Sequence, residues 1–501
     1  MKTKFTSLLA LALLVANAAM AQSFSVTMTE AGSLADSIPA DKHYTMTGLT
    51  VSGPINGDDV RFLRDVMSVE TYGGTPKGRL TSLNLKDARI VPGGAPYYEG
   101  VDGSNRPVSY STRQDTIGSR MFYNCSKLRT VQLPETVVYL DSLCFFNTAL
   151  VTVRMPESVK GIGLGAFQQC RSMTTFVPNE ACESYGLLCF YYCDKLKRFE
   201  FPNGVKKLGD GMFNYCDALT YVKLPESIEE LPMMLFENTH ALTTIVMPTE
   251  LKHIGERAFM YSSSITSLAL PEGLETIGSY AFAGCSNLSR CTIPSTVREV
   301  GPLSYIGLWK MNGIQVHPDN PYLMSEEGSL YSKDGSVMYQ FFNGWGLDSL
   351  VVPETVQEIA YEGCGYSYDL KHIVLPESLL LIGSMGIDFC YYLEDIICKA
   401  QTPPDCVGRA IDPQIVSQAT LYVPRASLAE YRKAPVWKDF KTIKPIPDGG
   451  DETGINTPST SAQGSAAIYD LSGRRMKAAG AGFSIVRESD GTVRKVYNVK
   501  R

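Results

Sequence analysis

Apolar residues recur along the chain in a pattern with two nested spacings. Between about residues 117 and 400, two apolar residues separated by one residue precede a proline, as in Val131, Leu133 and Pro134. Such prolines come 22–24 residues apart, at Pro134, Pro156, Pro178, Pro202, Pro225, Pro248, Pro271 and Pro294. A period of two predicts a short strand with one buried face, and proline ends that strand.

Each unit continues with a second apolar segment that contains an aromatic residue. The segment Ile277–Phe282 has the size for a turn and a short helical piece that places Phe282 in the interior. A unit of this size cannot bury its apolar face alone. We therefore expect the units to stack, with the strands of successive units side by side in a parallel sheet.

The residues of this unit resemble the BspA-type leucine-rich repeat between about Ile117 and Ala400. The resemblance is carried by Leu219–Leu224, Pro225, Ile228, Leu231 and Phe236, and by Ile277, Gly278, Ala281, Phe282, Cys285 and Leu288. It implies an α/β solenoid: a right-handed stack with a parallel sheet on one face, short helical turns on the other, and a cap at both ends. It also implies adhesion to host proteins or to other cells.

Breaks in the pattern divide the chain into segments. We expect a helix from Asp58 to Met67 with Asn56 or Asp58 as its N-cap, a strand Thr420–Val423, and a helical stretch Ser427–Phe440. The predicted segments are 1–21, a signal peptide; 22–114, the N-terminal cap and first strands; 115–302, repeats; 303–346, an insertion containing a hairpin; 347–400, further repeats; 401–447, the C-terminal cap; 448–466, a linker; and 467–501, a basic tail.

The two ends of the chain suggest export. Lys2 and Lys4, the apolar run Leu8–Val15 and the small residues before Gln22 are typical of a secretory signal peptide, so we expect an extracellular or cell-surface protein, with the periplasm as an alternative address. The segment from Ile468 to Val486 resembles a shortened end of the C-terminal sorting domain of the type IX secretion route of Bacteroidetes. Because residues 467–501 hold eight basic and three acidic side chains, a basic hairpin that docks on an acidic solenoid is the alternative.

The composition narrows the class of function. A formal net charge of −6 argues against a nucleic-acid partner, and no apolar stretch is long enough for a transmembrane segment. The sequence holds no phosphate-binding loop, nucleophile elbow or metalloprotease motif, and its five histidines are scattered. We therefore predict a protein that is not an enzyme, with no cofactor, catalytic residue or metal site, and keep a hydrolase as a remote alternative.

The 13 cysteines fit the repeat better than they fit a disulfide framework. Twelve fall on positions that the pattern places in the interior, where a free thiol behaves as a small apolar group, and Cys406 falls outside the repeat. No Cys-x-x-Cys motif points to zinc.

The residues flanking the buried strand positions should face outward and form a candidate ligand face. Two outward rows are predicted, with charge in the early coils and apolar residues such as Val374 and Ile397 in the late ones. The residues selected from these rows are Arg154, Arg198, Glu200, Tyr221, Lys223, Val246, Arg290 and His372.

A second candidate is an aromatic ladder beside the interior aromatic column. Its members follow the interior ring by one or two residues and are Tyr123, Tyr191, Tyr192, Tyr215 and Tyr261. Stacked rings could bind sugars or fill a partner's pockets, and packing between coils accounts for them equally well. The leading prediction is therefore adhesion or protein–protein interaction with an extracellular protein or cell-surface ligand, and the alternative is a glycan-binding surface module.

Overall fold

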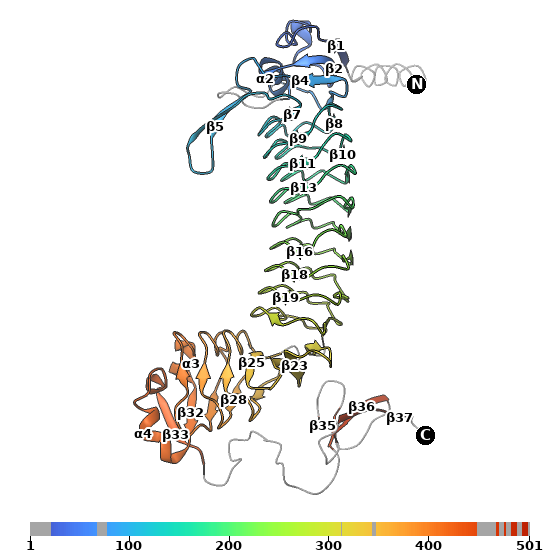
Figure 1. Ribbon diagram of the computed structural model, residues 1–501. Coiled ribbons are helices and arrows are strands. Elements are labelled where there is room, and N and C mark those ends of the chain that lie inside the picture. Colours follow the sequence, from blue (N-terminus) through green and yellow to red (C-terminus); the bar gives the residue numbers. More distant parts are fainter. Residues whose placement is uncertain are drawn as a thin grey trace, which may run out of the picture. The chain divides into compact units, whose positions relative to one another are not determined.

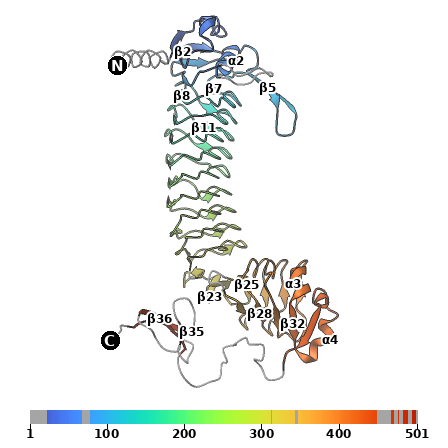
Figure 2. The ribbon, with the colours of Figure 1, turned by 180° about the vertical axis from the view of Figure 1, so that it is seen from behind.

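The computed structural model describes residues 22–67, 78–311, 313–342 and 347–447, together with four strands of the C-terminal segment (Figure 1). The predicted signal peptide and linker lie outside the described residues. The chain divides into two compact units, Met1–Asp334 and Gly335–Arg501. Both contain coils that stack through parallel strands, so the predicted solenoid is confirmed (Figures 1 and 2).

One side of the first unit carries the predicted strands. In β15, Val222 is buried while Tyr221 and Lys223 point outward, because side chains alternate across a strand. The strands of this face are β1 (Ser23–Thr27), β2 (Gly48–Ile55), β3 (Ser82–Asn84), β8 (Thr130–Gln132), β10 (Thr152–Arg154), β12 (Thr175–Val177), β14 (Arg198–Glu200), β15 (Tyr221–Lys223), β17 (Thr244–Val246), β20 (Thr292–Ile293) and β22 (Gln315–Val316), with β4 (Ala88–Ile90) paired to β2.

A second strip of parallel strands, which the sequence did not predict, follows each proline. Each strand has two residues, one of them inward, such as Leu231 or Ile254. The strip consists of β7 (Thr116–Ile117), β9 (Tyr139–Leu140), β11 (Gly161–Ile162) and β13 (Ser184–Tyr185), then β16 (Glu230–Leu231), β18 (His253–Ile254), β19 (Thr276–Ile277) and β21 (Glu299–Val300). Glycine follows several of these strands because the coils touch there: a Cβ on Gly209 would lie 2.2 Å from the backbone nitrogen of Leu187.

The third side differs from the expected helical turn. Its segments are hydrogen-bonded turns in which two residues, four apart, have positive φ, as at Arg120 and Asn124. Alternate amides there bond to the next coil, since Arg120 N donates to Ser142 O at 3.0 Å and Phe122 N to Cys144 O at 2.8 Å. Hydrogen bonds between coils therefore replace those of a helix.

The interior is a column of aromatic rings, as the repeat predicts. The rings of Phe190, Phe213 and Phe236 stack at centroid distances of 5.7 and 5.8 Å, and all three side chains are fully buried. All 13 cysteines are free, and the 12 predicted to be interior are buried, whereas Cys406 is partly buried.

The buried thiols also act as hydrogen-bond donors. Cys216 Sγ lies 3.2 Å from Phe190 O, and Ser262, in the same column, donates to Phe236 O at 2.8 Å. Burial raises the pKa of Cys170 to about 11 and of Cys125 to about 12, so these thiols keep their protons.

The N-terminal cap supplies donors that a preceding coil would otherwise provide. Helix α2 (Gly57–Val66) begins after Asn56, whose side chain accepts from Asp58 N, so the predicted helix and one of its two predicted N-caps are confirmed. Its buried Arg64 donates through Nη1 to Met121 O at 3.0 Å and to Tyr123 O at 3.4 Å. The hydroxyl of Tyr97 donates to Ser119 O at 2.9 Å, so carbonyls at the start of the stack are satisfied.

Two hairpins interrupt the coils of the first unit. β5 (Tyr98–Val101) pairs antiparallel with β6 (Pro107–Tyr110) and extends from the stack (Figure 1). β23 (Leu323–Glu326) pairs antiparallel with β24 (Ser329–Ser332), within the predicted insertion. A short 3-10 helix, η1 (Ala40–Lys42), precedes β2.

The second unit repeats the coil on a smaller scale. Its strands are β25 (Val337–Gln340), β27 (Glu358–Ile359), β29 (Leu381–Ile382) and β31 (Asp405–Cys406) on one side, and β26 (Ser349–Val351), β28 (His372–Leu375), β30 (Asp395–Cys398), β32 (Thr420–Val423) and β33 (Thr442–Pro445) on the other. The predicted strand Thr420–Val423 is confirmed. The C-terminal segment contains β34 (Ala467–Tyr469), β35 (Arg475–Met476), β36 (Gly482–Arg487) and β37 (Val493–Asn498), paired antiparallel.

The predicted helical stretch Ser427–Phe440 is broken into short pieces. The helices of this region are α3 (Pro413–Gln418), η2 (Arg425–Ser427), α4 (Leu428–Tyr431) and η3 (Trp437–Asp439). The break falls at Pro435, because the carbonyl of Pro435 accepts from Trp437 N at 2.8 Å and Val436 adopts a φ of 66°. This γ-turn is rare for a β-branched residue.

Candidate interaction surface

The predicted rows align across β14, β15 and β17 on the strand face of the first unit. Arg198 is in register with Tyr221, and Tyr221 with Thr244, while Glu200 is in register with Lys223, and Lys223 with Val246. Phe199 and Val222 between them point inward and are buried. The pleat therefore presents these side chains together, and we name Arg198, Glu200, Tyr221 and Lys223 the sheet patch.

Arg198 organises the sheet patch. Its guanidinium carbon lies 3.7 Å from the centroid of the Tyr221 ring, and its Nε donates to Glu200 Oε1 at 2.8 Å. A guanidinium over an aromatic face is attracted by the ring quadrupole. The patch thus combines an ordered cation, an aromatic ring and a carboxylate on a partly exposed surface.

Other predicted residues extend this face along the stack. Arg154 is exposed on β10, Arg290 forms a bridge with Ser267, and Val246 is 37% exposed. Within the described part of the chain, Arg154, Lys223 and Arg290 make no ion pair. Their charges remain available to a ligand.

The late coils do not continue the row as predicted. Val374 and Ile397, expected to form an outward apolar stripe, are 2% and 9% exposed and pack against Tyr422 and Ile446. The chain after β33 passes over this position and covers it. His372 also belongs to the second unit, where its Nδ1 lies 3.0 Å from Asp395 Oδ2.

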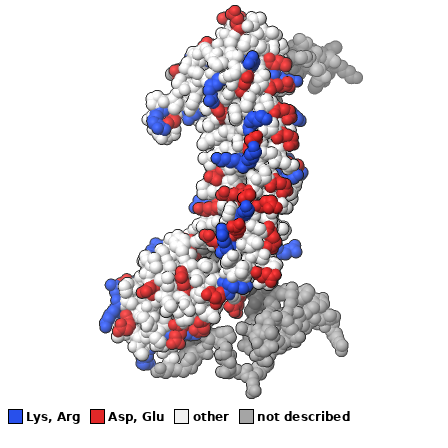
Figure 3. All heavy atoms as spheres, in the orientation of Figure 1, with Lys and Arg blue, Asp and Glu red and all other residues white. Residues whose placement is uncertain are grey.

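Charged side chains form a neighbouring column, the compensated column, in which each cation pairs with a carboxylate of an adjacent coil. This column was not predicted from the sequence. Lys206 pairs with Glu183 at 2.9 Å, Lys252 with Glu229 at 2.8 Å, and Arg298 with Glu275 at 2.9 Å. Hydrogen bonding to Lys206 and to Lys252 lowers the pKa of Glu183 and of Glu229. The alternation of charge every 23 residues was the available signal, and Figure 3 shows basic and acidic side chains adjacent along the stack.

The predicted aromatic ladder forms two columns on the turn side. Tyr192 and Tyr215 stack at 4.6 Å, Tyr191 packs edge-on against Tyr192 at 4.5 Å, and Arg171 lies 4.7 Å from the Tyr192 centroid. Tyr261 is 47% exposed, but its ring lies against Gly284, where a Cβ would be 2.4 Å away. Tyr192 and Tyr215 therefore cover one face of each other, and Gly284 lies against the ring of Tyr261, whereas sugar stacking requires a free face.

The ring of Tyr123 contacts the N-terminal hairpin formed by β5 and β6. Its ring stacks on Phe146 at 4.7 Å and contacts Tyr98 of β5 edge-on at 6.0 Å. Arg120 donates to the Tyr98 hydroxyl and to Val101 O, both at 2.8 Å. This side chain therefore fixes the hairpin to the first coils.

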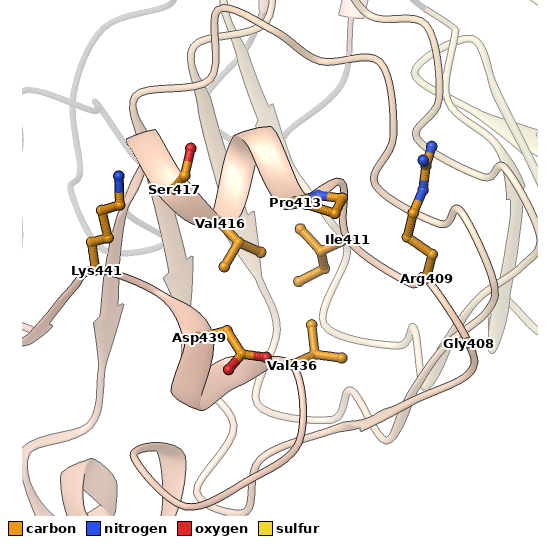
Figure 4. A pocket seen from close by; sticks show the side chains of 9 residues that line it. All are labelled: Gly408, Arg409, Ile411, Pro413, Val416, Ser417, Val436, Asp439 and Lys441. Atoms are coloured by element: carbon orange, nitrogen blue, oxygen red, sulfur yellow. The ribbon is translucent and has the colours of Figure 1, made fainter.

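A pocket of about 450 Å³ lies in the C-terminal part of the second unit (Figure 4). Arg409 on its rim is engaged by the buried Asp388 and lies 3.8 Å from Asp412. Ile411, Val416 and Val436 give it apolar walls; the full lining is Gly408, Arg409, Ile411, Pro413, Val416, Ser417, Val436, Asp439 and Lys441.

Two kinds of feature are absent from the described residues. No helix among them has the length and apolarity needed to cross a bilayer. No group of three or more His, Cys, Asp or Glu side chains in the same residues could hold a metal ion.

Comparison with known proteins identifies the repeat. The family described as BspA type leucine rich repeat region matches residues 104–218, 183–311 and 336–403. No curated protein matches the chain.

Solved structures with related coils come from several bacteria. A leucine-rich repeat protein of Bacteroides ovatus is 22% identical, with 68% of this chain and 89% of that chain covered and a TM-score of 0.43. A leucine rich cell surface protein of Faecalibacterium prausnitzii is 16% identical, with 74% and 98% covered and a TM-score of 0.37. The pneumococcal vaccine antigen PcpA is 15% identical, with 69% and 82% covered and a TM-score of 0.26.

Proposed function

The chain belongs to the BspA-type leucine-rich repeat family, and from this premise we propose that it is a non-catalytic, exported protein that binds another protein at the cell surface. Leucine-rich repeat coils bury their own apolar side and leave a broad, regular surface for a partner. The sequence pattern before Gln22 supports export, and the sorting role of the basic tail remains part of this proposal.

The observation that carries the proposal is the sheet patch. Arg198 and Tyr221 stack on one another, and Lys223 lies two residues after Tyr221 on the same face of β15. Arginine and tyrosine are enriched among residues that dominate binding energy at protein interfaces. The cations of the compensated column beside the patch pair with carboxylates of adjacent coils, whereas Arg198 pairs within its own strand and Lys223 makes no ion pair with the described residues.

The test is an array of extracellular-matrix proteins and glycans probed with the full chain and two variants. The face variant carries Arg198→Ala, Tyr221→Ala and Lys223→Ala. The matched control carries Lys206→Ala, Lys252→Ala and Tyr139→Ala, which also removes two cations and one exposed tyrosine. Protein hits lost in the face variant and kept in the control support the proposal. Equal retention in both variants, or hits confined to glycans, would contradict it.

A further inference from the structure

The second unit carries an exposed cluster of aromatic side chains on the turn side of two consecutive coils. Tyr392, Tyr368 and Tyr361 are 67%, 47% and 44% exposed, although tyrosine is a large, largely apolar side chain. Clusters of this kind on a soluble surface mark interaction sites. The cluster, which we name the aromatic patch, consists of four rings in contact, Tyr366, Tyr368, Phe389 and Tyr391, and of the exposed Tyr361 and Tyr392, which lie in the same two turns of the chain.

Four rings of the aromatic patch form one stacked pair and two edge-on contacts. Tyr366 and Phe389 stack at 4.3 Å with an interplanar angle of 19°. Tyr368 stands at 79° to Tyr366, and Tyr391 at 81° to Phe389, with centroids 6.5 and 5.9 Å apart. Tyr368 is thus not a member of the stack, and its exposure leaves ring surface open to solvent. This differs from Tyr192 and Tyr215 of the first unit, which stack face to face.

Carboxylates underlie and border these rings. Asp388 is fully buried between the stacked coils, with its Oδ1 accepting from Phe389 N at 2.9 Å and its Oδ2 engaged by Arg409. Asp412 and Glu362 are 7% and 4% exposed. Arg409 thus engages Asp388 and lies 3.8 Å from Asp412, while the exposed carboxylate of Asp369 beside Tyr368 has no ion pair with the described residues.

Nearby carboxylates add to desolvation in raising the pKa of two phenols of the aromatic patch. Desolvation, with Asp412 and Asp388 nearby, raises the pKa of Tyr391. Desolvation, the charge of Glu362 and a hydrogen bond to it raise the pKa of Tyr361. A negative potential that disfavours a phenolate favours a cation at the same place.

We propose that the aromatic patch binds an extended basic segment of a partner protein, with arginine or lysine side chains lying against the rings of Tyr368 and Tyr392. Open ring faces attract cations through their quadrupole, and the surrounding carboxylates add to that attraction. A purely apolar partner would bury carboxylates without a counter-ion, which is costly. This site lies on the second unit and is independent of the sheet patch.

The test measures binding of a synthetic Arg-Gly repeat peptide to the immobilised full chain, with an Asp-Gly repeat peptide as the probe of opposite charge. The patch variant carries Tyr368→Ala and Tyr392→Ala, both at exposed positions that tolerate truncation. The control variant carries Tyr139→Ala and Tyr322→Ala, which are 52% and 53% exposed elsewhere on the chain. A third variant with Tyr368→Phe and Tyr392→Phe keeps the rings and removes the hydroxyls.

We expect the Arg-Gly peptide to bind at least about fivefold more weakly to the patch variant than to the unmodified chain, with little change in the control and phenylalanine variants. Asp369→Asn should weaken binding and lower its dependence on salt. The Arg198→Ala, Tyr221→Ala, Lys223→Ala chain should bind the peptide normally, which separates this site from the proposed function. Equal binding to the patch variant, equal binding of the Asp-Gly peptide, or no binding to the unmodified chain would overturn the proposal.

Discussion

The interior column and the outward rows of the first unit share one period but differ in how far their residues vary from coil to coil. Inside, the same ring returns in every coil, as at Phe167, Phe190 and Phe213, each fully buried and stacked within 5.7 Å of the next. Outside, the equivalent positions change from Thr175 to Arg198 to Tyr221. The interior repeats because each ring packs on its neighbours, while the outward rows carry no such demand.

This difference separates the residues that hold the fold from those that can recognise a ligand. Loss of an interior side chain should destabilise the coils, whatever ligand the protein binds. Loss of an outward group should leave the coils intact and remove binding. The following predictions test that separation, beginning with the largest effect.

Alkaline pH should destabilise the interior most strongly. Twelve thiols are buried, and burial raises their pKa, to about 11 for Cys170 and about 12 for Cys125. The folded chain keeps these protons while the unfolded chain loses them above about pH 9, so stability falls as pH rises from there. Each buried thiol lowers the free energy of unfolding by about 1.4 kcal/mol per pH unit until the pH reaches the pKa of that thiol in the folded chain.

Urea unfolding at a series of pH values measures this effect. Cys216→Ser removes one titrating thiol and keeps a hydrogen-bond donor. The free energy of unfolding should therefore fall less steeply with pH, by about 1.4 kcal/mol per pH unit. A midpoint that stays constant between about pH 8 and 11 would contradict the buried, protonated thiols.

Truncating an interior ring should cost several kcal/mol. Phe213 is fully buried between Phe190 and Phe236 and also contacts Phe199 at 5.1 Å, so Phe213→Ala leaves a cavity lined by rings. We expect a loss of about 3–5 kcal/mol in the free energy of unfolding, measured by chemical denaturation. Tyr139→Ala at an exposed position is the control, and equal losses in the two variants would contradict the column.

Removing the guanidinium of the N-terminal cap should loosen the first coil. Arg64→Met keeps the buried stem and leaves Met121 O and Tyr123 O without their donor. We expect a loss of about 1–3 kcal/mol, with faster amide hydrogen exchange in residues 118–128. Arg61→Met on the exposed side of the same helix should change neither quantity.

A smaller effect distinguishes a thiol that donates from one that only fills space. Cys216→Ser should remain close to the unmodified stability at neutral pH, because Ser262 already makes the equivalent bond. Cys216→Ala is close to serine in size and loses the donor to Phe190 O, so it should be less stable than Cys216→Ser by about 1 kcal/mol. Alanine that stabilises the fold relative to serine would show that burial alone governs this column.

How much of this could be read from the sequence depends on how often each signal is repeated. The face strands, the interior rings and the buried cysteines were predictable because the same spacing returns in many units. The second strip was not, since each of its strands contributes one inward residue such as Leu231. The turns were mistaken for helical ones because residues such as Tyr192 and Leu188 adopt positive φ without being glycine, held by hydrogen bonds between coils.

The candidate site was predictable in part for the same reason. The pleat places Arg198 and Tyr221 side by side once the register is known. Burial of Val374 under Ile446 was not predictable, because the covering residue lies 72 positions later in an irregular segment. The role of Arg64 likewise depends on carbonyls 57 and 59 positions away.

The central claim is tested most directly by measuring stability and binding on the same variant of the sheet patch. The chain with Arg198→Ala, Tyr221→Ala and Lys223→Ala should unfold within about 1.5 kcal/mol of the unmodified chain, because each surface substitution usually changes stability by no more than about 0.5 kcal/mol. The same protein should lose its protein hits on the extracellular-matrix array. Normal stability with unchanged hits would contradict the sheet patch as the interaction surface.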